Sequence, residues 1–442
     1  MRSLTQLPLL PAVLAGAVLA SAAFADQDAK KPVSFALKGG VTYTDNRDDI
    51  EDGALRAGVP MKKEDQWSFY IAPVIAFHHE VTDSVEFDAS YSPVYHWYDN
   101  CRPGSEKSKL EHALRADLKL MLSPITTLKV GERFWFSGQK DYFYGEGYNY
   151  DPTRPNRLGN DYYENRLNAS LKQELSEGGD YAKVSGRWRI KRYDDDELAD
   201  SSDEDEYGAR LDLMRVHSKH FTYGLFADYT SWDRCTDASQ YQDMKLELGV
   251  DYATFGAQAT WDFYGNGDTY LYGSAGWTRA WYEADDMDDT DAPAMQLEMR
   301  LFQTKPTQLL AGIRYGRDFS DIYPFSSQLD LASYIALTQY VGADRDLWLN
   351  ASLELRNRQY DVEDDLDPTA YRYGYVEALK QANGGKTEFD RDSVYVRLAA
   401  NYRVNDWLAT SAFYSYEKID SDEKIGTSYD ENVFGLSATL KY

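Results

Sequence analysis

The chain is poor in cysteine and in basic residues, and it lacks long apolar runs. It has two cysteines, so at most one disulfide can form within it. Its 47 Lys and Arg residues face 73 Asp and Glu residues, and the net charge of −26 argues against nucleic acid as a partner. After residue 25 no run of about 18 apolar residues occurs, which excludes a membrane-spanning helix from the rest of the chain.

The histidines, also scarce, form no catalytic or metal-binding pattern. The six are His78, His79, His96, His112, His217 and His220. The first two are neighbours on one predicted strand and therefore face opposite ways, and the last two flank a tight turn. No Gly-x-Ser-x-Gly motif is present, and no histidine spacing matches a zinc site. We therefore expect no enzyme activity, no cofactor and no metal site.

The N-terminus has the pattern of a secretory signal peptide. Arg2 precedes an apolar stretch from Leu7 to Ala20, and Ala23-Phe24-Ala25 forms a small-x-small cleavage site. The alternative is a membrane anchor, but the apolar stretch is shorter than the roughly 20 residues that a spanning helix needs. We expect residues 1–25 to be removed after Ala25 and residues 26–442 to form the mature protein.

Period-2 alternation recurs along residues 26–442, in segments rich in Tyr, Phe, Trp and Leu. Such alternation averages the hydropathy of lipid-facing residues with that of lumen-facing residues, so the mean hydropathy of −0.61 is compatible with a transmembrane barrel. The segments are longer than the roughly 5 to 6 residues typical of a secreted β-sandwich or solenoid, which is the alternative. The pattern predicts an all-β fold, a single transmembrane antiparallel β-barrel in the Gram-negative outer membrane.

The connections between these segments alternate in length. Eight are short, around Asp83, Pro124, Gly178-Gly179, Lys219, Gly265 to Asp268, Pro306, Ala343-Asp344 and Asn405-Asp406. Nine are longer and polar: 45–66, 99–107, 138–160, 194–205, 234–242, 284–292, 319–326, 361–389 and 419–429. This arrangement predicts about eighteen strands with periplasmic turns and extracellular loops. The weakest point is Met244 to Tyr264, where the apolar face switches from Val250 and Tyr252 to Phe255 and Ala257, and we expect a bulge there.

The last segment ends on an aromatic residue. Phe434, Leu436, Ala438, Leu440 and Tyr442 share one apolar face, and the alternate residues are small or polar. Bacterial outer-membrane barrels end in a similar way. We therefore expect contact with outer-membrane lipid and recognition of the strand ending at Tyr442 by the barrel-insertion machinery.

Strand parity, the alternation of side chains between the two faces of a strand, places many bases on the inner face. On the segment from Tyr181, four bases alternate with apolar residues, and a charge at the bilayer midplane costs about 2 to 4 kcal/mol. The predicted pore-lining bases are Lys183, Arg187, Arg189, Lys191, Arg115, Arg133, Arg300, Arg314, Arg356, Arg358 and Arg397. The same parity turns Lys119, Lys129 and Lys172 inward. It also turns acids inward, among them Glu164, Asp251 and Asp330. Such an interior is either a hydrated channel or a lumen closed by ion pairs, and eighteen strands favour the channel.

Three loop features admit two interpretations each. Tyr142, Phe143, Tyr144, Tyr148 and Tyr150 either stack on sugar rings or belong to an aromatic girdle at the membrane interface. Cys101 and Cys235 are either a disulfide or two separate thiols, because the even count favours a bridge and the distance around the ring opposes it. The acidic runs Asp194 to Glu206 and Glu283 to Asp291 are either solvated loops or weak sites for divalent cations.

Short motifs resemble those of the β-barrel porin 2 family. They are Val41 to Asn46, Ser90 to Asn100, Leu110 to Leu114 and Asn160 to Asn165. The chain is also similar in size to the alginate-exporter barrels. The resemblance implies an outer-membrane channel for saccharides or an anionic polysaccharide, with a periplasmic export partner if the direction is outward. The alternative is a non-conducting structural or adhesive barrel.

Overall fold

The computed structural model describes most of the chain between residues 32 and 442. The described ranges are 32–46, 55–56, 59–60, 62–82, 84–100, 107–137, 162–193, 203–234, 249–283, 289–319, 327–361, 377, 380–381, 384–385, 388–421 and 428–442. The predicted signal peptide, the aromatic residues Tyr142 to Tyr150 and both cysteines lie outside these ranges, and so does most of each acidic run.

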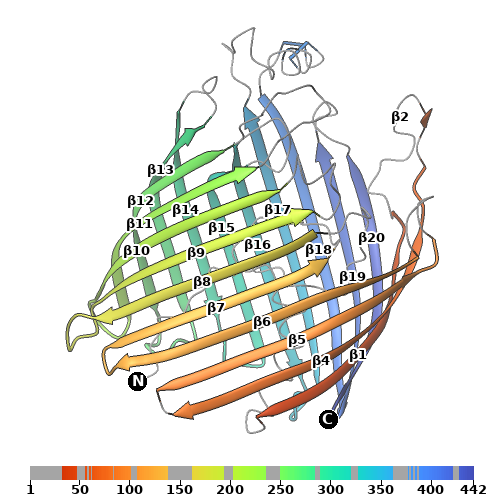
Figure 1. Ribbon diagram of the computed structural model, residues 1–442, viewed down its shortest axis with the longest axis horizontal. Helices are drawn as coiled ribbons and strands as arrows, with labels where there is room; N and C mark the ends of the chain where they lie inside the picture. The colour runs from red at the N-terminus through yellow and green to blue at the C-terminus, as the bar shows by residue number, and fades with distance from the viewer. Residues whose placement is uncertain are drawn as a thin grey trace.

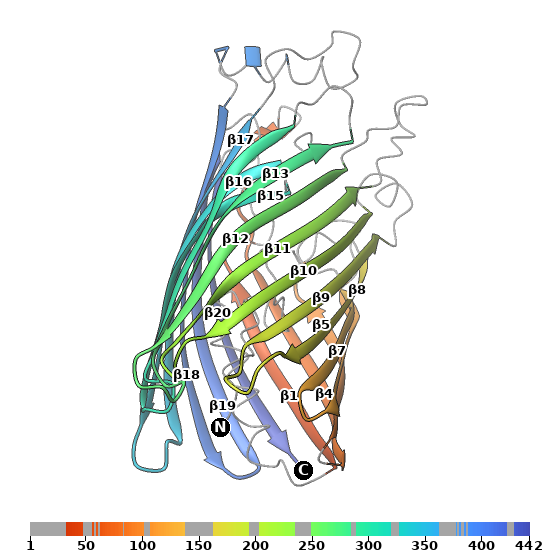
Figure 2. The same ribbon diagram turned by 90° about the vertical axis from the view of Figure 1, so that its left-hand side faces the viewer.

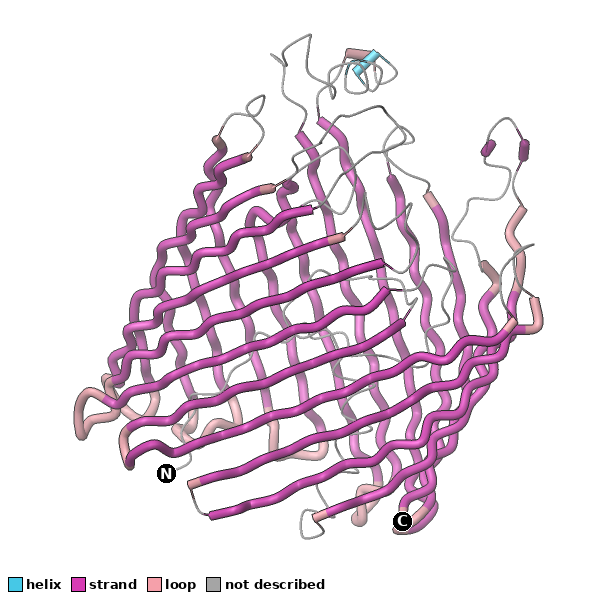
Figure 3. Tube along the Cα trace, viewed as in Figure 1, coloured by secondary structure: helices cyan, strands magenta, loops and turns pink. Residues whose placement is uncertain are grey.

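Eighteen strands form one closed antiparallel sheet (Figures 1 and 3), as the alternating connections predict. They are β1 (Val33–Thr44), β4 (Gln66–Thr82), β5 (Val85–Tyr98), β6 (Ser108–Ser123), β7 (Thr126–Ser137), β8 (Tyr162–Glu174), β9 (Tyr181–Tyr193), β10 (Glu204–Val216), β11 (Phe221–Arg234), β12 (Val250–Asp262), β13 (Tyr270–Tyr282), β14 (Thr290–Leu301), β15 (Thr307–Phe319), β16 (Ser327–Val341), β17 (Leu347–Asp361), β18 (Glu388–Asn405), β19 (Leu408–Ser421) and β20 (Tyr429–Lys441).

Each strand pairs with its neighbour in sequence, and β1 closes the barrel by pairing with both β4 and β20. A separate two-stranded ladder joins β2 (Leu55–Arg56) and β3 (Val59–Pro60). The strands tilt strongly against the barrel axis (Figure 2), as closed barrels require. Among the described residues, no helix is long and apolar enough to cross a membrane.

All eight short connections fall where the sequence predicts them. Three of them are two-residue links, between β4 and β5, between β6 and β7, and between β18 and β19. The longest joins β12 to β13 through Gly265 and Gly267, which both have positive φ. Glycine supplies this conformation without steric cost. The eight turns therefore lie at one end of the barrel and the nine longer connections at the other.

The alternation of side chains divides the sheet into an apolar outer face and a polar inner face. On β4, Trp67, Phe69, Ile71 and Ile75 are each more than 40% exposed, whereas Tyr70 between them is buried. The predicted outer face of the last strand is also exposed, with Leu436 at 60%. The outer residues are therefore placed to face lipid acyl chains, which are the only apolar medium available to them.

The predicted bulge in Met244 to Tyr264 is wrong for the described part of that segment. β12 runs from Val250 to Asp262 in unbroken register with both neighbours. Val250 and Tyr252 face inward and are buried, so the apolar outer face begins only at Phe255. Asp251, which the bulge would have turned inward, shares the outer face of β12 instead.

The ladder between β14 and β15 stops early. It extends only from Met295–Leu301 to Leu309–Tyr315, although both strands continue toward the long connections and keep their other partners. Beyond this point Phe319 packs against Trp232 and Tyr252, which face inward from β11 and β12. The end of β15 therefore lies inside the wall formed by β11 to β13.

Candidate functional site

The inner face of the barrel is a charged wall, and parity explains its composition. On β9, Val184 and Trp188 are exposed on the outer face. The alternate residues of the strand point to the inner face and cannot reach the membrane. The wall contains both signs of charge because the neighbouring strands β8 and β10 contribute acids. Cross-strand register then decides which bases are neutralised and which are not.

Arg187 and Arg189 on β9 are bound by acids on both sides. Arg189 Nε lies 2.9 Å from Glu164 Oε1, and its Nη1 lies 3.0 Å from Glu204 Oε2. Arg187 contacts Glu206 and Asp228, each at 3.1 Å. Glu164 is fully buried and also accepts a hydrogen bond from Arg166. These charges are mutually compensated, so they contribute little net field to the lumen.

A second compensated cluster lies on β14 to β17. Asp330 accepts hydrogen bonds from Arg314 at 2.7 Å and from Arg356 at 2.6 and 3.0 Å. Next to it, Glu298 accepts one hydrogen bond from Arg300 at 2.7 Å. Its other oxygen accepts a hydrogen bond from the Tyr334 hydroxyl at 2.8 Å. The Asp330 carboxylate and the Arg356 guanidinium are almost completely buried, so this part of the wall is closed by hydrogen-bonded ion pairs.

A third group differs from these two because bases dominate it. Lys119, Lys129, Lys172 and Lys183 come from β6, β7, β8 and β9, and we call them the lysine patch. Lys119 is paired in register with Lys129, and Lys172 with Lys183. The charges acting on Lys129 include those of the other three. The sequence places all four inward but gives no sign that they meet.

Among the described residues, only two members of the lysine patch have a carboxylate partner. Lys119 Nζ lies 2.8 Å from Glu86 Oε2, and Lys172 Nζ lies 3.5 Å from Glu174 Oε1. Within the described residues, Lys129 and Lys183 make no hydrogen bond or ion pair. The Lys119 side chain is 43% exposed on a face that looks into the barrel, so a solute inside can reach it.

The remaining predicted pore-lining bases have varied surroundings. Arg115 and Arg133 share Asp117, at 2.6 and 2.9 Å, and the Arg115 side chain is 56% exposed. Lys191 lies over the Tyr162 ring at 4.6 Å, and Arg397 lies over the Phe413 ring at 4.5 Å. Arg358 is buried. Arg115 and, within the patch, Lys119 at 43% are thus more accessible than Lys172, whose side chain is 17% exposed.

The described histidines do not form a catalytic constellation. His96 Nε2 lies 3.2 Å from Glu111 Oε2 in a fully buried pair, and His78 Nδ1 lies 2.6 Å from Asp88. No nucleophilic side chain is hydrogen-bonded to either of them in the described ranges. No group of three or more His, Cys, Asp or Glu residues is arranged to hold a metal ion in the same part of the chain.

A closed antiparallel barrel with an apolar outer face and a charged inner face is a transmembrane β-barrel of the outer-membrane type, because only a closed sheet satisfies its backbone groups in lipid. No family model matches the chain, and no curated protein matches its sequence. The resemblance to the porin 2 family therefore stays a prediction.

Solved structures of outer-membrane channels and receptors are similar to the barrel. Acinetobacter baumannii OccAB4 is 12% identical, with 94% of this chain and 100% of that chain covered and a TM-score of 0.45. Pseudomonas aeruginosa OccK2 in complex with glucuronate is 12% identical over 92% and 98%, with a TM-score of 0.45. The siderophore receptor PirA from Acinetobacter baumannii is 6% identical over 93% and 81%, with a TM-score of 0.48. Likeness at this level carries no inference about a substrate.

Proposed function

We propose that the chain forms an outer-membrane channel that passes hydrophilic solutes and prefers anions. Uronate-containing or other anionic saccharides are the best substrate candidates. The observation that carries the proposal is the lysine patch, in which Lys129 and Lys183 face the lumen without a carboxylate partner in the part of the chain that the structure describes. Uncompensated charge in a low-dielectric wall concentrates counter-ions, so anions should enter this barrel more readily than cations.

The proposal assigns the anion preference to the lysine patch and not to the arginines of β9. Sequence parity alone emphasises Arg187 and Arg189, but each of these has two acid partners. Removing either base would take one partner from two carboxylates and would change stability and selectivity together. Lys129 and Lys183 offer a cleaner test, because their charge can be reversed without orphaning an acid.

Planar-bilayer recordings of the purified barrel test this proposal. We expect Lys129→Glu with Lys183→Glu to shift ion preference from anions toward cations. The recordings should be made near 0.1 M salt, where the Debye length is about 10 Å. Lys219→Glu with Lys418→Glu is a matched control, since both lysines are exposed and lie outside the lumen, in a turn and on the outer face of β19. This control should leave the preference unchanged.

Two outcomes would contradict the proposal. Equal shifts in the test and control variants would make net protein charge the cause. An absence of conductance in the wild type would favour the alternative, a structural or adhesive barrel closed by its ion pairs.

The proposal includes two partners. One is a polysaccharide-export partner in the periplasm, and the other is the insertion machinery, which would recognise the strand ending at Tyr442. Neighbouring genes for glycosyltransferases would favour export, and genes for polysaccharide lyases would favour uptake.

A further inference from the structure

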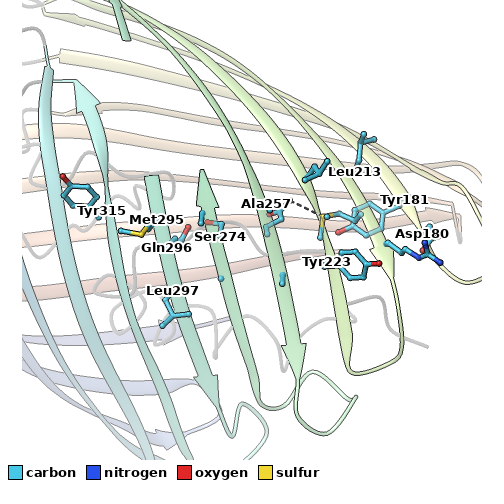
Figure 4. Close-up of a pocket in the computed structure, with 18 of the residues that line it drawn as sticks. Asp180, Tyr181, Leu213, Tyr223, Ala257, Ser274, Met295, Gln296, Leu297 and Tyr315 are labelled. Atoms are coloured by element: carbon cyan, nitrogen blue, oxygen red, sulfur yellow. Dashed lines mark hydrogen bonds between the residues drawn. The ribbon is translucent and has the colours of Figure 1, made fainter. Parts of the chain in front are cut away.

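The outer surface of the barrel is not evenly convex. A furrow of about 1320 Å3 runs across the lipid-facing side from the turn between β8 and β9 to β16 (Figure 4). Its size exceeds that of most small-molecule pockets, and its lining comes mainly from outward-facing apolar residues of β10 to β16. A furrow on this face is in contact with the membrane and not with the lumen.

Four small residues form the floor of the furrow. On β12 and β13, Ala257 pairs with Ala275, and Ala259 pairs with Gly273, all four on the outer face. Larger residues flank the floor along both strands: Phe255 pairs with Trp277 at one end, and Trp261 pairs with Leu271 at the other. The depression therefore follows from a local change in side-chain size on two adjacent strands.

Large residues on the neighbouring strands form the walls. On the β11 side, Leu225 lies opposite Ala257 and Tyr223 lies opposite Ala259. On the β14 side, Met295 lies opposite Ala275 and Leu297 lies opposite Gly273. Figure 4 shows Tyr223 on one side of Ala257, and Met295 and Leu297 on the other. Leu225 is 63% exposed, so it stands well above the floor.

The periplasmic end of the furrow is lined by a base, Arg215, and by an acid, Asp180, whose carboxylate accepts a hydrogen bond from the Val216 amide at 2.8 Å. Arg215, on the outer face of β10 next to the last residue of that strand, lines the furrow and is exposed. Within the described residues it makes no hydrogen bond or ion pair. An unpaired guanidinium at the level of the inner-leaflet headgroups favours a phosphate as its partner.

We propose that this furrow binds one phospholipid of the inner leaflet with an anionic headgroup. An acyl chain lies on the alanine and glycine floor between the two walls, and the phosphate pairs with Arg215. Apolar contact fills a depression that would otherwise leave its lining without close neighbours, and the charge selects the headgroup. The inference does not depend on the channel function.

Native mass spectrometry of the detergent-purified full chain tests the proposal, with phosphatidylglycerol and phosphatidylcholine as probes. We expect one phosphatidylglycerol to be retained in preference to phosphatidylcholine. Arg215→Gln should weaken retention of phosphatidylglycerol about fivefold, as expected for one lost contact between a base and a headgroup, and should leave phosphatidylcholine unaffected.

A second pair of variants tests the shape of the furrow. Ala257→Leu with Ala275→Leu fills the floor and should reduce retention of both lipids. The matched control is Ala400→Leu with Ala412→Leu, a cross-strand pair of exposed alanines on β18 and β19 outside the furrow. Heat-modifiable gel migration shows that each variant is folded. Equal retention in all variants, equal loss in the test and control pairs, or a dimer in place of a lipid adduct would overturn the proposal.

Discussion

Phe319 lies flat on Trp232, with ring centroids 4.9 Å apart and ring planes inclined by 5°. The two residues belong to β15 and β11, which are not neighbours in the sheet. The two rings meet because the end of β15 no longer pairs with β14 and lies on the lumen side of the wall formed by β11 to β13. Arg317 follows the same path, and its Nη1 donates a hydrogen bond to the Tyr282 hydroxyl at 3.3 Å. The barrel mouth is therefore held together at this point by side-chain packing in place of backbone pairing.

Phe319→Ala should lower the free energy of unfolding by about 3 to 5 kcal/mol, as other buried Phe→Ala changes do. Urea unfolding in lipid vesicles measures the change. Phe255→Ala is the control, since Phe255 is 64% exposed on the outer face and should cost much less. Equal costs for the two variants would show that the stacked pair does not hold the mouth.

Asp330→Asn should have two effects, because this carboxylate compensates both Arg314 and Arg356. Leaving two guanidinium groups against a neutral amide should destabilise the barrel by about 3 to 5 kcal/mol. It should also increase anion preference in bilayer recordings. Asp420→Asn, on the exposed outer face of β19, should do neither. A stability loss without any change in selectivity would place the Asp330 cluster away from the ion path.

Asp268→Asn should remove an acid-sensitive part of the stability. In the turn between β12 and β13, Asp268 accepts hydrogen bonds from the Thr304 hydroxyl at 2.6 Å and from its amide at 2.7 Å, and these lower the pKa of its carboxyl. A lowered folded-state pKa stabilises the fold above the unfolded value of about 4, and this contribution disappears as pH falls through the folded value.

The urea midpoints of wild type and Asp268→Asn should therefore differ at pH 6 and converge below about pH 4. Asp344→Asn is the control, because the Asp344 side chain is exposed in another short turn and should show no such dependence. A difference that stays constant across this pH range would contradict the assignment.

Gly435→Leu should impair closure of the barrel. Gly435 faces inward between β19 and β1, and a Cβ atom there would meet the Phe413 ring. Overpacking of this kind costs about 1 to 3 kcal/mol. Gly39→Leu is the control on the outer face of the adjoining strand, where the nearest atom to a new Cβ lies at 3.6 Å. Heat-modifiable gel migration should show less closed barrel for the first variant only.

Strand positions were predictable because outward residues must be apolar and turns need special residues. The exception, β12, shows the limit of that rule. Val250 and Tyr252 are apolar and yet face inward, where they pack with Trp232, Ala280 and Phe319. An apolar cluster inside the mouth inverts the alternation signal, and no pattern within one strand distinguishes it from a lipid-facing segment.

The lysine patch was only half predictable for a related reason. Parity gives the face of each side chain, so Lys129 and Lys183 are inward in the sequence reading as in the structure. Neutralisation depends on register between strands, which pairs Lys119 with Lys129 and brings the Glu164 carboxylate within reach of Arg189, diagonally across from it on β9. A single strand does not contain this information.

The pairing of β1 with β20 is a step of barrel assembly that joins distant parts of the chain, whereas the other steps join strands that are close in sequence. Every other ladder of the barrel joins strands that follow each other along the chain, whereas the Thr44 hydroxyl donates a hydrogen bond to Glu431 from a distance of 387 residues. Local hairpins can form early, but the remote ladder must wait for both of its strands. Until then the molecule is an open sheet with two unpaired edges, which are templates for aggregation. The time spent in that state, more than the stability of any hairpin, should decide how much of the protein reaches the membrane.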